Sequence, residues 1–419
     1  MDLDLKGGKF TWFSNPRNGF VIREKIDMAL VNWEWMSMYQ NASLSLMSAV
    51  SSDHCPLILD VIPVHRVRKY FKFEAYWADH KDCSNVVKRG WCKEEQNGDE
   101  WDKISRNINN CKGELKKWSK VIFKRADREI QKMKDELKKL HNSDFTEENQ
   151  RRMQLLKENI ATLWKQEEKF WEQRSRLKWL RWRNKNTAFF HATTIHRRQR
   201  NRIERPKNAS GQWLNNTSEI MEHIEEHFQK LFASATRHGF EGTINKISRV
   251  TKEINNELLM DIMDEEVRKA VFSMGSLKAL GPDGLNGIFY QKHWEVISKD
   301  VCAVVRAFFN SGHIPEEINE TTVVLIPKTK NPESLNELRP ISCCNFIYKI
   351  ISRIIVLRLK KWMEAIVSPT QSTFVGGRLI QDNVVIVQEV YHSLNRKGKG
   401  GSNSLAIKLD MNKAYDRLE

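Results

Sequence analysis

The feature that most constrains this sequence is a heavily charged, proline-free stretch over residues 101–173 that holds a single glycine. Apolar residues such as Leu115, Trp118 and Ile122 recur at three- and four-residue spacing, which is typical of an amphipathic helix. Residues 141–144 interrupt the pattern, and helix-favouring residues resume at position 146. The stretch therefore predicts two long helices, over 101–140 and 146–173, joined as a hairpin that connects other parts of the chain.

Length and composition limit the class of protein. The 419 residues exceed one compact core, so we expect two or more domains. No apolar run approaches the roughly 20 residues of a membrane span, and the first residues lack a secretory signal, so we expect an intracellular chain without a membrane partner. Seven scattered cysteines show no CxxC pairing, which argues against a disulfide framework or a zinc site. Oligomeric state is left open.

The net charge of +16 indicates a polyanionic partner, and it is concentrated in one region. Residues 101–200 hold 27 Lys and Arg against 13 Asp and Glu, and residues 171–207 hold 12 against two. Aromatic rings interleave with these cations, and such rings stack on unpaired bases while cations neutralise phosphates. The alternative is an amphipathic helix with its aromatic stripe in a core and its charges in water. The residues that we predict to contact nucleic acid are Arg174, Arg176, Trp179, Arg181, Arg183, Lys185, Arg197, Arg198, Arg200 and Arg202.

The first 62 residues have a different pattern, with strand-like alternation at 9–13 and a turn at 15–19. Asp53 and His54 open a second strand-like run. Asp27 lies between the two strand-like segments, directly after an apolar residue. A neutral imidazole can take a proton from water, and a carboxylate can orient it, so hydrolytic chemistry is compatible with this pattern. The alternative is a strand-edge pair without chemistry.

Residues 321–344 predict a β-hairpin with cations on both arms. Residues 321–326 are a β-branched strand that Pro327 ends, and Lys328 lies in the polar turn that follows. Arg339 begins the returning arm. Such a hairpin can hold a triphosphate, the arginine in bidentate fashion. Residues 345–362 then predict an amphipathic helix, and a second helix is expected over about 381–394.

A carboxylate ends the last predicted strand, because residues 405–409 are followed by Asp410. An aspartate beside a turn suits Mg²⁺, which takes one or two carboxylates together with waters and substrate phosphates. The alternative role for Asp410 is a helix N-cap.

The ordered series of C-terminal motifs resembles the reverse transcriptases of non-LTR (LINE-type) retrotransposons, the plant-type branch in particular. The matching motifs are Ile326-Pro327-Lys328, Leu338-Arg339-Pro340-Ile341-Ser342, Gln371-Ser372-Thr373-Phe374, Leu409-Asp410 and Ala414-Tyr415-Asp416. The resemblance implies that Asp410 binds catalytic Mg²⁺, that Tyr415 lies under the incoming sugar, and that Lys328 and Arg339 bind the triphosphate of a deoxynucleotide. Two departures are Leu280, where the family's lead-in has Pro, and the basic residues 181–184, where its connector has an acidic turn.

The N-terminal residues resemble the C-terminal end of the endonuclease/exonuclease/phosphatase family, over about residues 5–62. The resemblance implies that His54 is the catalytic histidine, Asp27 its orienting carboxylate and Asp53 the aspartate on the metal side. The family's earlier metal-binding residues would precede Met1, so the implied metal site is incomplete and we expect no hydrolysis.

Together these features predict a multi-domain α+β protein. We expect a truncated endonuclease β-sandwich remnant over residues 1–62, a long basic helical connector over 63–207, a small helical unit over 208–275, and the fingers and first palm motif of a reverse transcriptase over 276–419. Helices are expected at 218–232 and 264–274 within the small unit.

The predicted function is that of a fragment of a retrotransposon RNA-directed DNA polymerase, with RNA, DNA and deoxynucleoside triphosphates as partners. Two-metal polymerisation needs a second carboxylate motif, which the sequence lacks, so we expect no polymerisation by the chain alone. The alternatives are a non-catalytic basic nucleic-acid-binding protein and a remnant metal-dependent endonuclease.

Overall fold

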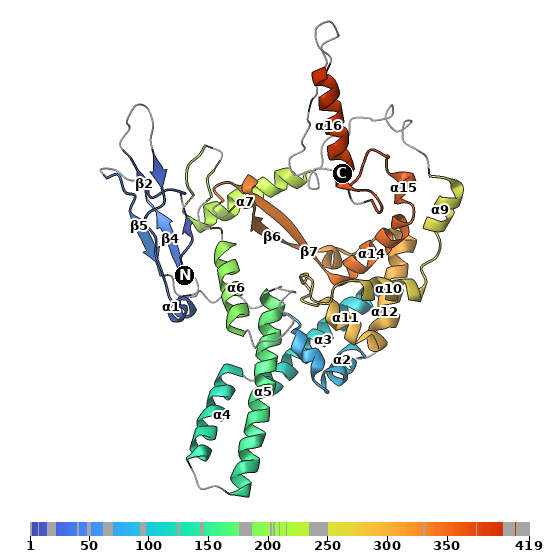
Figure 1. Ribbon diagram of the computed structural model, residues 1–419. Helices are drawn as coiled ribbons and strands as arrows, with labels where there is room; N and C mark the ends of the chain where they lie inside the picture. The colour runs from blue at the N-terminus through green and yellow to red at the C-terminus, as the bar shows by residue number, and fades with distance from the viewer. Residues whose placement is uncertain are drawn as a thin grey trace. The chain divides into compact units, whose positions relative to one another are not determined.

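Figure 1 shows the structure, a computed structural model, as a ribbon. The chain divides into two compact units. Unit 1 comprises residues 1–221 and 271–349, and unit 2 comprises residues 222–270 and 350–419. The residues that the structure describes are 2–6, 8–14, 22–39, 42–47, 52–61, 70–92, 98–123, 126–142, 146–175, 187–201, 203, 206–208, 210–214, 216–233, 250–329, 332–373, 375–396 and 407.

Short strands form the N-terminal part of unit 1. Three of them, β1 (Leu5–Lys6), β4 (Ser43–Leu46) and β5 (Leu57–Asp60), make a sheet in the order β1-β4-β5, with β1 parallel and β5 antiparallel to β4. Strands β2 (Trp12–Phe13) and β3 (Arg23–Glu24) pair as a separate antiparallel ribbon. Helix α1 (Trp33–Met38) begins where the Asn32 side chain accepts a hydrogen bond from the Trp35 N–H.

The core of this sheet includes a residue from far along the chain. Leu5, Met36 and Leu44 are buried together with Ile195, which belongs to helix α6 (Thr187–Arg200). Short strands bury too little apolar surface to be stable alone, so the helix supplies part of the missing core. The predicted boundary at residue 62 therefore separates residues that share one apolar cluster.

Five further elements precede α6. They are the 3₁₀ helix η1 (Ala75–Asp79) and the helices α2 (Cys83–Trp91), α3 (Glu100–Ile122), α4 (Ala126–His141) and α5 (Glu147–Ser175). Helix α3 begins at Asp99, whose carboxylate accepts a hydrogen bond of 2.7 Å from the Asp102 N–H.

The prediction of one uninterrupted helix over residues 101–140 is wrong, because α3 ends at Ile122, with Phe123 as its C-cap, and α4 begins at Ala126. The Phe123 ring packs edge-on against Trp118 at 5.2 Å and against Tyr76 at 5.0 Å between centroids, and it stacks on Trp77. This aromatic cluster holds the Phe123 backbone in an extended conformation (φ −105°, ψ 90°). Partners that lie some 45 positions earlier in the sequence thus override the local helical pattern.

The predicted helical hairpin is confirmed by α4 and α5, which lie side by side (Figure 1). Ile130 of α4 and Leu156 and Ile160 of α5 are buried. Across the seam, Arg152 Nη2 lies 2.6 Å from Glu136 Oε1. The rest of the hairpin surface is exposed or half-buried and rich in charged residues.

A helical core supports the C-terminal half of unit 1. It includes α11 (Gly287–Lys292), α12 (Trp294–Ser311) and the short α13 (Glu316–Asn319). Phe73 is fully buried against Phe289, with ring centroids 5.3 Å apart, and Trp91 donates to Asp300 at 2.8 Å. Burial lowers the pKa of His293 in this core to about 4, so this histidine is neutral at physiological pH.

The predicted hairpin over residues 321–344 is confirmed. Strand β6 (Thr321–Pro327) pairs antiparallel with β7 (Leu338–Cys344) in a register that runs from Thr321 opposite Cys344 to Pro327 opposite Leu338. A 3₁₀ turn, η2 (Leu335–Glu337), leads into β7, and α14 (Phe346–Lys360) follows it.

Unit 2 contains α9 (Lys252–Leu258), α15 (Met363–Ile366) and α16 (Ile380–Arg396), while α7 (Thr217–Phe232), α10 (Asp264–Ser273) and α14 each extend across a unit boundary. Within unit 2 the guanidinium of Arg358 holds both carboxylate oxygens of Glu266, at 2.7 and 2.8 Å, and donates to the Leu258 and Met260 carbonyls. In the described ranges, no helix has the length and apolar character that crossing a membrane requires.

Candidate nucleotide and nucleic-acid sites

The structure brings Asp27 and His54 together at one edge of the N-terminal part. Asp27 Oδ2 lies 3.0 Å from His54 Nδ1. The Thr11 hydroxyl accepts hydrogen bonds from the backbone N–H groups of Ile26 and Asp27, which fixes the backbone that carries the carboxylate. The hydrogen bond from His54, followed by that from Thr11, lowers the pKa of Asp27. This geometry can orient an imidazole for proton transfer.

Asp53 is held nearby by the ring of Trp12. The Trp12 Nε1–H donates to Asp53 Oδ2 at 2.9 Å, and this bond lowers the pKa of Asp53. An antiparallel bridge joins Trp12 to His54. Thr11 and Trp12 lie in the strand-like run that precedes the turn, so the sequence pattern placed them on a strand. It did not indicate a role for either side chain.

Lys328 and Arg339 lie on the same face of the β6–β7 hairpin. Arg339 stands directly opposite Ile326, and Lys328 follows Ile326 by two residues, so the two cations share a face by the alternation of strand side chains. The Lys328 N–H donates to the Glu337 carbonyl at 2.8 Å, which extends the ladder past Pro327. Both cations are exposed, and Lys328 Nζ contacts the Asn336 carbonyl at 2.9 Å.

Arg174, a predicted nucleic-acid contact, is engaged within the protein. Its two terminal nitrogens donate to the two carboxylate oxygens of Glu74 at 2.9 and 2.7 Å. The guanidinium also lies 3.3 Å from the ring centroid of Phe170, close enough for a cation–π contact. Glu74 is a partner that the sequence pattern did not indicate, since 100 positions separate it from Arg174.

Arg197 caps the C-terminal end of α5. It donates to the Ser175 carbonyl at 2.9 Å and to the Arg174 carbonyl, two groups that the last turn of a helix leaves without intrahelical partners. Arg198 and Arg200, on the same helix α6, are exposed to solvent.

Several predicted site residues lie outside the described residues. They are Asp410, Tyr415, Arg176, Trp179, Arg181, Arg183, Lys185 and Arg202. Among the residues that are described, no group of three or more His, Cys, Asp and Glu side chains is arranged to hold a metal ion.

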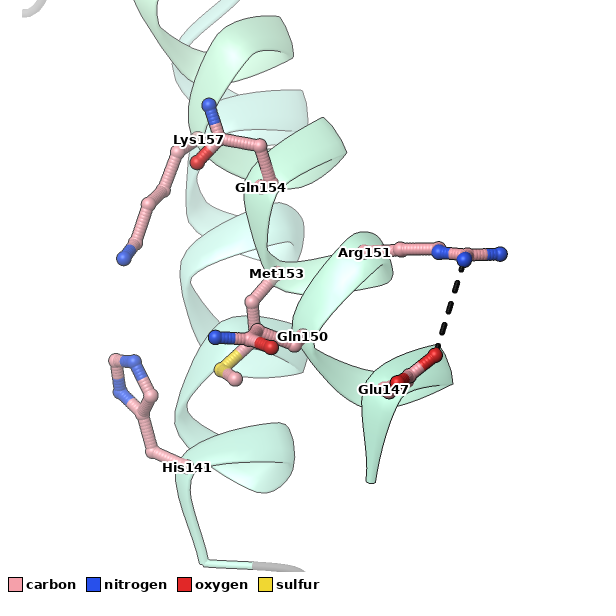
Figure 2. Close-up of a pocket in the computed structure, with 7 residues that line it drawn as sticks. All are labelled: His141, Glu147, Gln150, Arg151, Met153, Gln154 and Lys157. Carbon is pink, nitrogen blue, oxygen red and sulfur yellow. Dashed lines mark ion pairs between the residues drawn. The ribbon is translucent and has the colours of Figure 1, made fainter. Parts of the chain in front are cut away.

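A separate open pocket of about 680 Å³ lies near the tip of the α4–α5 hairpin (Figure 2). His141 and Lys157 lie on one side of it, while Arg151 points away and pairs with Glu147 at 3.8 Å. None of the residues predicted from the sequence to act in catalysis or binding lines this pocket.

The C-terminal residues 326–419 match the model of the reverse transcriptase (RNA-dependent DNA polymerase) family. The match begins at Ile326, within β6, and includes the face that carries Lys328 and Arg339. It defines this region of the chain as reverse transcriptase sequence.

Two curated relatives belong to transposable elements. The chain is 25% identical over 415 residues to the transposon TX1 uncharacterized 149 kDa protein of Xenopus laevis, covering 96% of this chain and 31% of that protein. It is 27% identical over 157 residues to the retrovirus-related Pol polyprotein from type-2 retrotransposable element R2DM of Drosophila melanogaster, covering 38% of this chain and 14% of that protein.

The chain thus spans about a third or less of the length of these relatives. The predicted resemblance to the RNA-directed DNA polymerases of non-LTR, LINE-type retrotransposons is confirmed, because residues 326–419 match the reverse transcriptase family and both relatives come from transposable elements. The resemblance of residues 1–62 to the endonuclease/exonuclease/phosphatase family stays a prediction.

Proposed function

We propose that this chain supplies the nucleotide-binding fingers hairpin and a nucleic-acid-binding connector of an RNA-directed DNA polymerase. The observation that carries the proposal is the shared face of Lys328 and Arg339 within the segment that matches the reverse transcriptase family. Two cations on adjacent strands can neutralise a triphosphate, the arginine through its planar fork and the lysine as a point charge.

The same face offers apolar surface beside the two cations. Val324 and Ile341 stand directly opposite each other, and they are 41% and 42% exposed. Exposed apolar pairs next to cations suit a ligand that combines phosphates with a flat, largely apolar base. A deoxynucleoside triphosphate or the nucleotide end of a nucleic acid has this combination.

Reverse transcriptases use divalent metal ions, and the assignment of Mg²⁺ to Asp410 and Asp53 rests on resemblance. Asp53 already accepts a hydrogen bond from Trp12. Within the described part of the chain, no set of His, Cys, Asp and Glu side chains is grouped as metal ligands. The proposal therefore concerns binding of nucleotides and nucleic acid.

Nucleotide binding is tested by fluorescence polarisation of a labelled deoxynucleoside triphosphate with purified chain. A charge-assisted hydrogen bond contributes about 1.5–3 kcal/mol, so Lys328→Ala and Arg339→Ala should each weaken affinity by about 10- to 100-fold. Arg339→Lys should fall between the wild type and Arg339→Ala, because it keeps the charge and loses the fork. Lys299→Ala, which removes an exposed cation of α12, is the control. Equal affinity of Arg339→Ala and Lys299→Ala would contradict the proposal.

Nucleic-acid binding by the connector is supported by a second observation, the exposure of Arg198 and Arg200 on α6. Basic residues that contact phosphates release counterions, so affinity depends on salt with a slope of about −0.7 to −0.9 per contact. In a filter-binding titration, the slope of log affinity against log salt concentration should therefore be shallower by about 1.4 to 1.8 in the double variant Arg198→Ala/Arg200→Ala than in the wild type. The matched control, Lys116→Ala/Lys120→Ala on α3, removes the same charge from another exposed surface. A slope that changes as much in the control would show that only total charge matters.

A further inference from the structure

The turn at the tip of the β6–β7 hairpin is held by hydrogen bonds among its own residues. The Glu333 N–H donates to Glu337 Oε2 at 2.7 Å, and the Glu337 carbonyl accepts a hydrogen bond from the Lys328 N–H at 2.8 Å. The Lys328 ammonium group donates to the Asn336 carbonyl at 2.9 Å. The position of this ammonium group therefore depends on how firmly residues 333–337 are fixed.

A second segment of unit 1, which contains residues 206–208 and 210–214, folds back on itself. An antiparallel bridge pairs Lys207 with Trp213, and the Leu214 N–H donates to the Pro206 carbonyl at 3.0 Å. The Lys207 ammonium group lies 4.5 Å from the centroid of the Trp213 ring, close enough for a cation–π contact. The Lys207 side chain is thus confined within its own segment.

Lys207 binds the hairpin turn through both its backbone and its side chain. The Lys207 N–H donates to the Glu333 carbonyl at 2.7 Å, and Lys207 Nζ lies 2.7 Å from Glu333 Oε2. The two side chains are 32% and 38% exposed, so water screens this ion pair only in part. Because 126 positions separate the two residues, the pair joins the end of the basic connector to the tip of the β6–β7 hairpin.

We propose that Lys207 is a positioning residue for nucleotide binding, which acts through the 333–337 turn on Lys328. The ion pair holds Glu333, the Glu333 N–H holds the Glu337 carboxylate, and the fixed turn presents the carbonyl that orients the Lys328 ammonium group. An ammonium group that is already oriented loses less rotamer entropy when it binds a phosphate. Two of its three N–H donors stay available for a triphosphate. The inference rests on the proposed function, because it concerns the same cation.

Lys207 is itself a cation, so a direct contact with the triphosphate is the competing explanation. The variant Glu333→Gln separates the two, because it keeps the size of the side chain and removes its negative charge. If Lys207 bound the triphosphate directly, this variant would strengthen nucleotide binding, since it frees the ammonium group and removes a repelling carboxylate. If Lys207 acts by position, the same variant weakens nucleotide binding, because the ion pair that fixes the turn is lost.

The test is fluorescence polarisation of a labelled deoxynucleoside triphosphate with the full chain. Lys207→Ala and Glu333→Gln should each weaken affinity by about twofold to fivefold, the effect of losing a half-buried ion pair. Lys207→Arg should bind as the wild type does, because arginine keeps the charge and pairs with a carboxylate. The matched control is Lys25→Ala, which breaks an ion pair with Asp2 of nearly the same distance, 2.8 Å, and exposure, 34% and 42%. This control should leave the affinity unchanged.

Double variants show whether Lys207 acts through Lys328. In the Lys328→Ala background, Lys207→Ala should have no further effect on nucleotide affinity, since the group that it positions is gone. In the Arg339→Ala background, Lys207→Ala should keep its effect of about twofold to fivefold. A role of Lys207 in stability alone would give the same loss of affinity in both backgrounds.

The positioning role is overturned if Glu333→Gln binds the nucleotide as tightly as the wild type or more tightly. Equal effects of Lys207→Ala in the two backgrounds, or an effect of Lys25→Ala as large as that of Lys207→Ala, would also overturn it. If Lys328→Ala leaves the affinity unchanged, the proposed function and the positioning role both fail. If Lys328→Ala weakens binding while Lys207→Ala does not, only the positioning role fails.

Discussion

Asp27 Oδ2 and His54 Nδ1 lie 3.0 Å apart, although 27 positions separate the two residues in the sequence. The backbone of Asp27 is fixed by the Thr11 hydroxyl, and the Trp12–His54 bridge brings the histidine to it. The orienting contact that the family resemblance implies is therefore present in the geometry, whereas a role in catalysis stays a prediction.

The hydrogen bond predicts a specific titration. His54→Ala should raise the pKa of Asp27 toward its ordinary value, because His54 is the main cause of the lowered pKa. The lowered value stabilises the folded state above the ordinary pKa, and this contribution is lost as the pH falls. Carboxyl ¹³C chemical shifts measured against pH would show the change. Trp12→Phe is the internal control, since it should raise the pKa of Asp53 instead.

Arg174 should stabilise the protein through Glu74. Arg174→Lys keeps the charge but loses the bidentate pair and the contact with Phe170, so we expect the local free energy of unfolding of α5 to fall by about 1–3 kcal/mol. Hydrogen exchange of the α5 amides measures this quantity. Arg151→Lys should change it by less than about 0.5 kcal/mol, because the pair with Glu147 is fully solvated. A large effect of Arg174→Lys on the salt slope of nucleic-acid binding would favour the original prediction instead.

Ile195 should be essential to the N-terminal core. Ile195→Ala removes a buried side chain from the cluster with Leu5, Met36 and Leu44, and such truncations cost about 2–5 kcal/mol. The expected result is increased exchange of the β1 and β4 amides. Leu155→Ala, which truncates a side chain that is 58% exposed, should leave these amides unchanged. If both variants behave alike, residues 1–62 do not depend on α6.

Two glycines should respond in opposite directions to the same substitution. Gly281→Ala forces a Cβ against the Asn345 backbone and should destabilise unit 1 by at least about 1–3 kcal/mol. Gly113→Ala, within α3 and with no heavy atom within 4 Å of the added Cβ, should stabilise the protein by up to about 1 kcal/mol. Thermal unfolding of both variants beside the wild type measures the difference. A stabilising Gly281→Ala would mean that Gly281 does not lie against Asn345.

Arg358 should be the main polar contact of unit 2. Arg358→Ala leaves Glu266 and two carbonyls without their donor, and losing one partner of a largely buried ion pair costs about 3–5 kcal/mol. Limited proteolysis between α9 and α10 should become faster. Lys361→Ala breaks the exposed pair with Glu257 and should cost less than about 1 kcal/mol. Equal proteolysis rates in the two variants would contradict this ranking.

Periodicity predicted the elements whose structure depends on neighbours in the sequence. The α4–α5 hairpin and the strand that Pro327 ends are of this kind, because helix propensity and the missing proline N–H act within a few residues. The end of α3 at Phe123 was not predictable in this way. Its cause is a ring cluster with Tyr76 and Trp77, which the chain reaches only after folding.

The roles of individual cations could be predicted only in part. Composition showed that residues 171–207 are strongly basic, but it could not distinguish Arg174 and Arg197, which bond within the protein, from Arg198 and Arg200, which face solvent. The difference depends on whether an acceptor is brought within about 3 Å, and such acceptors lie on other elements.

The sequence alone determined the resemblance to a known family, the order of the motifs and the position of the charge, because these properties can be read along the chain. Only the tertiary structure decided which groups meet: Asp27 with His54, Arg174 with Glu74, and the Asn345 side chain with the Asp283 backbone N–H. The physical reason is that burial and hydrogen bonding act over a few ångströms in space. Residues far apart in the chain therefore set both the pKa of a carboxyl and the availability of a cation.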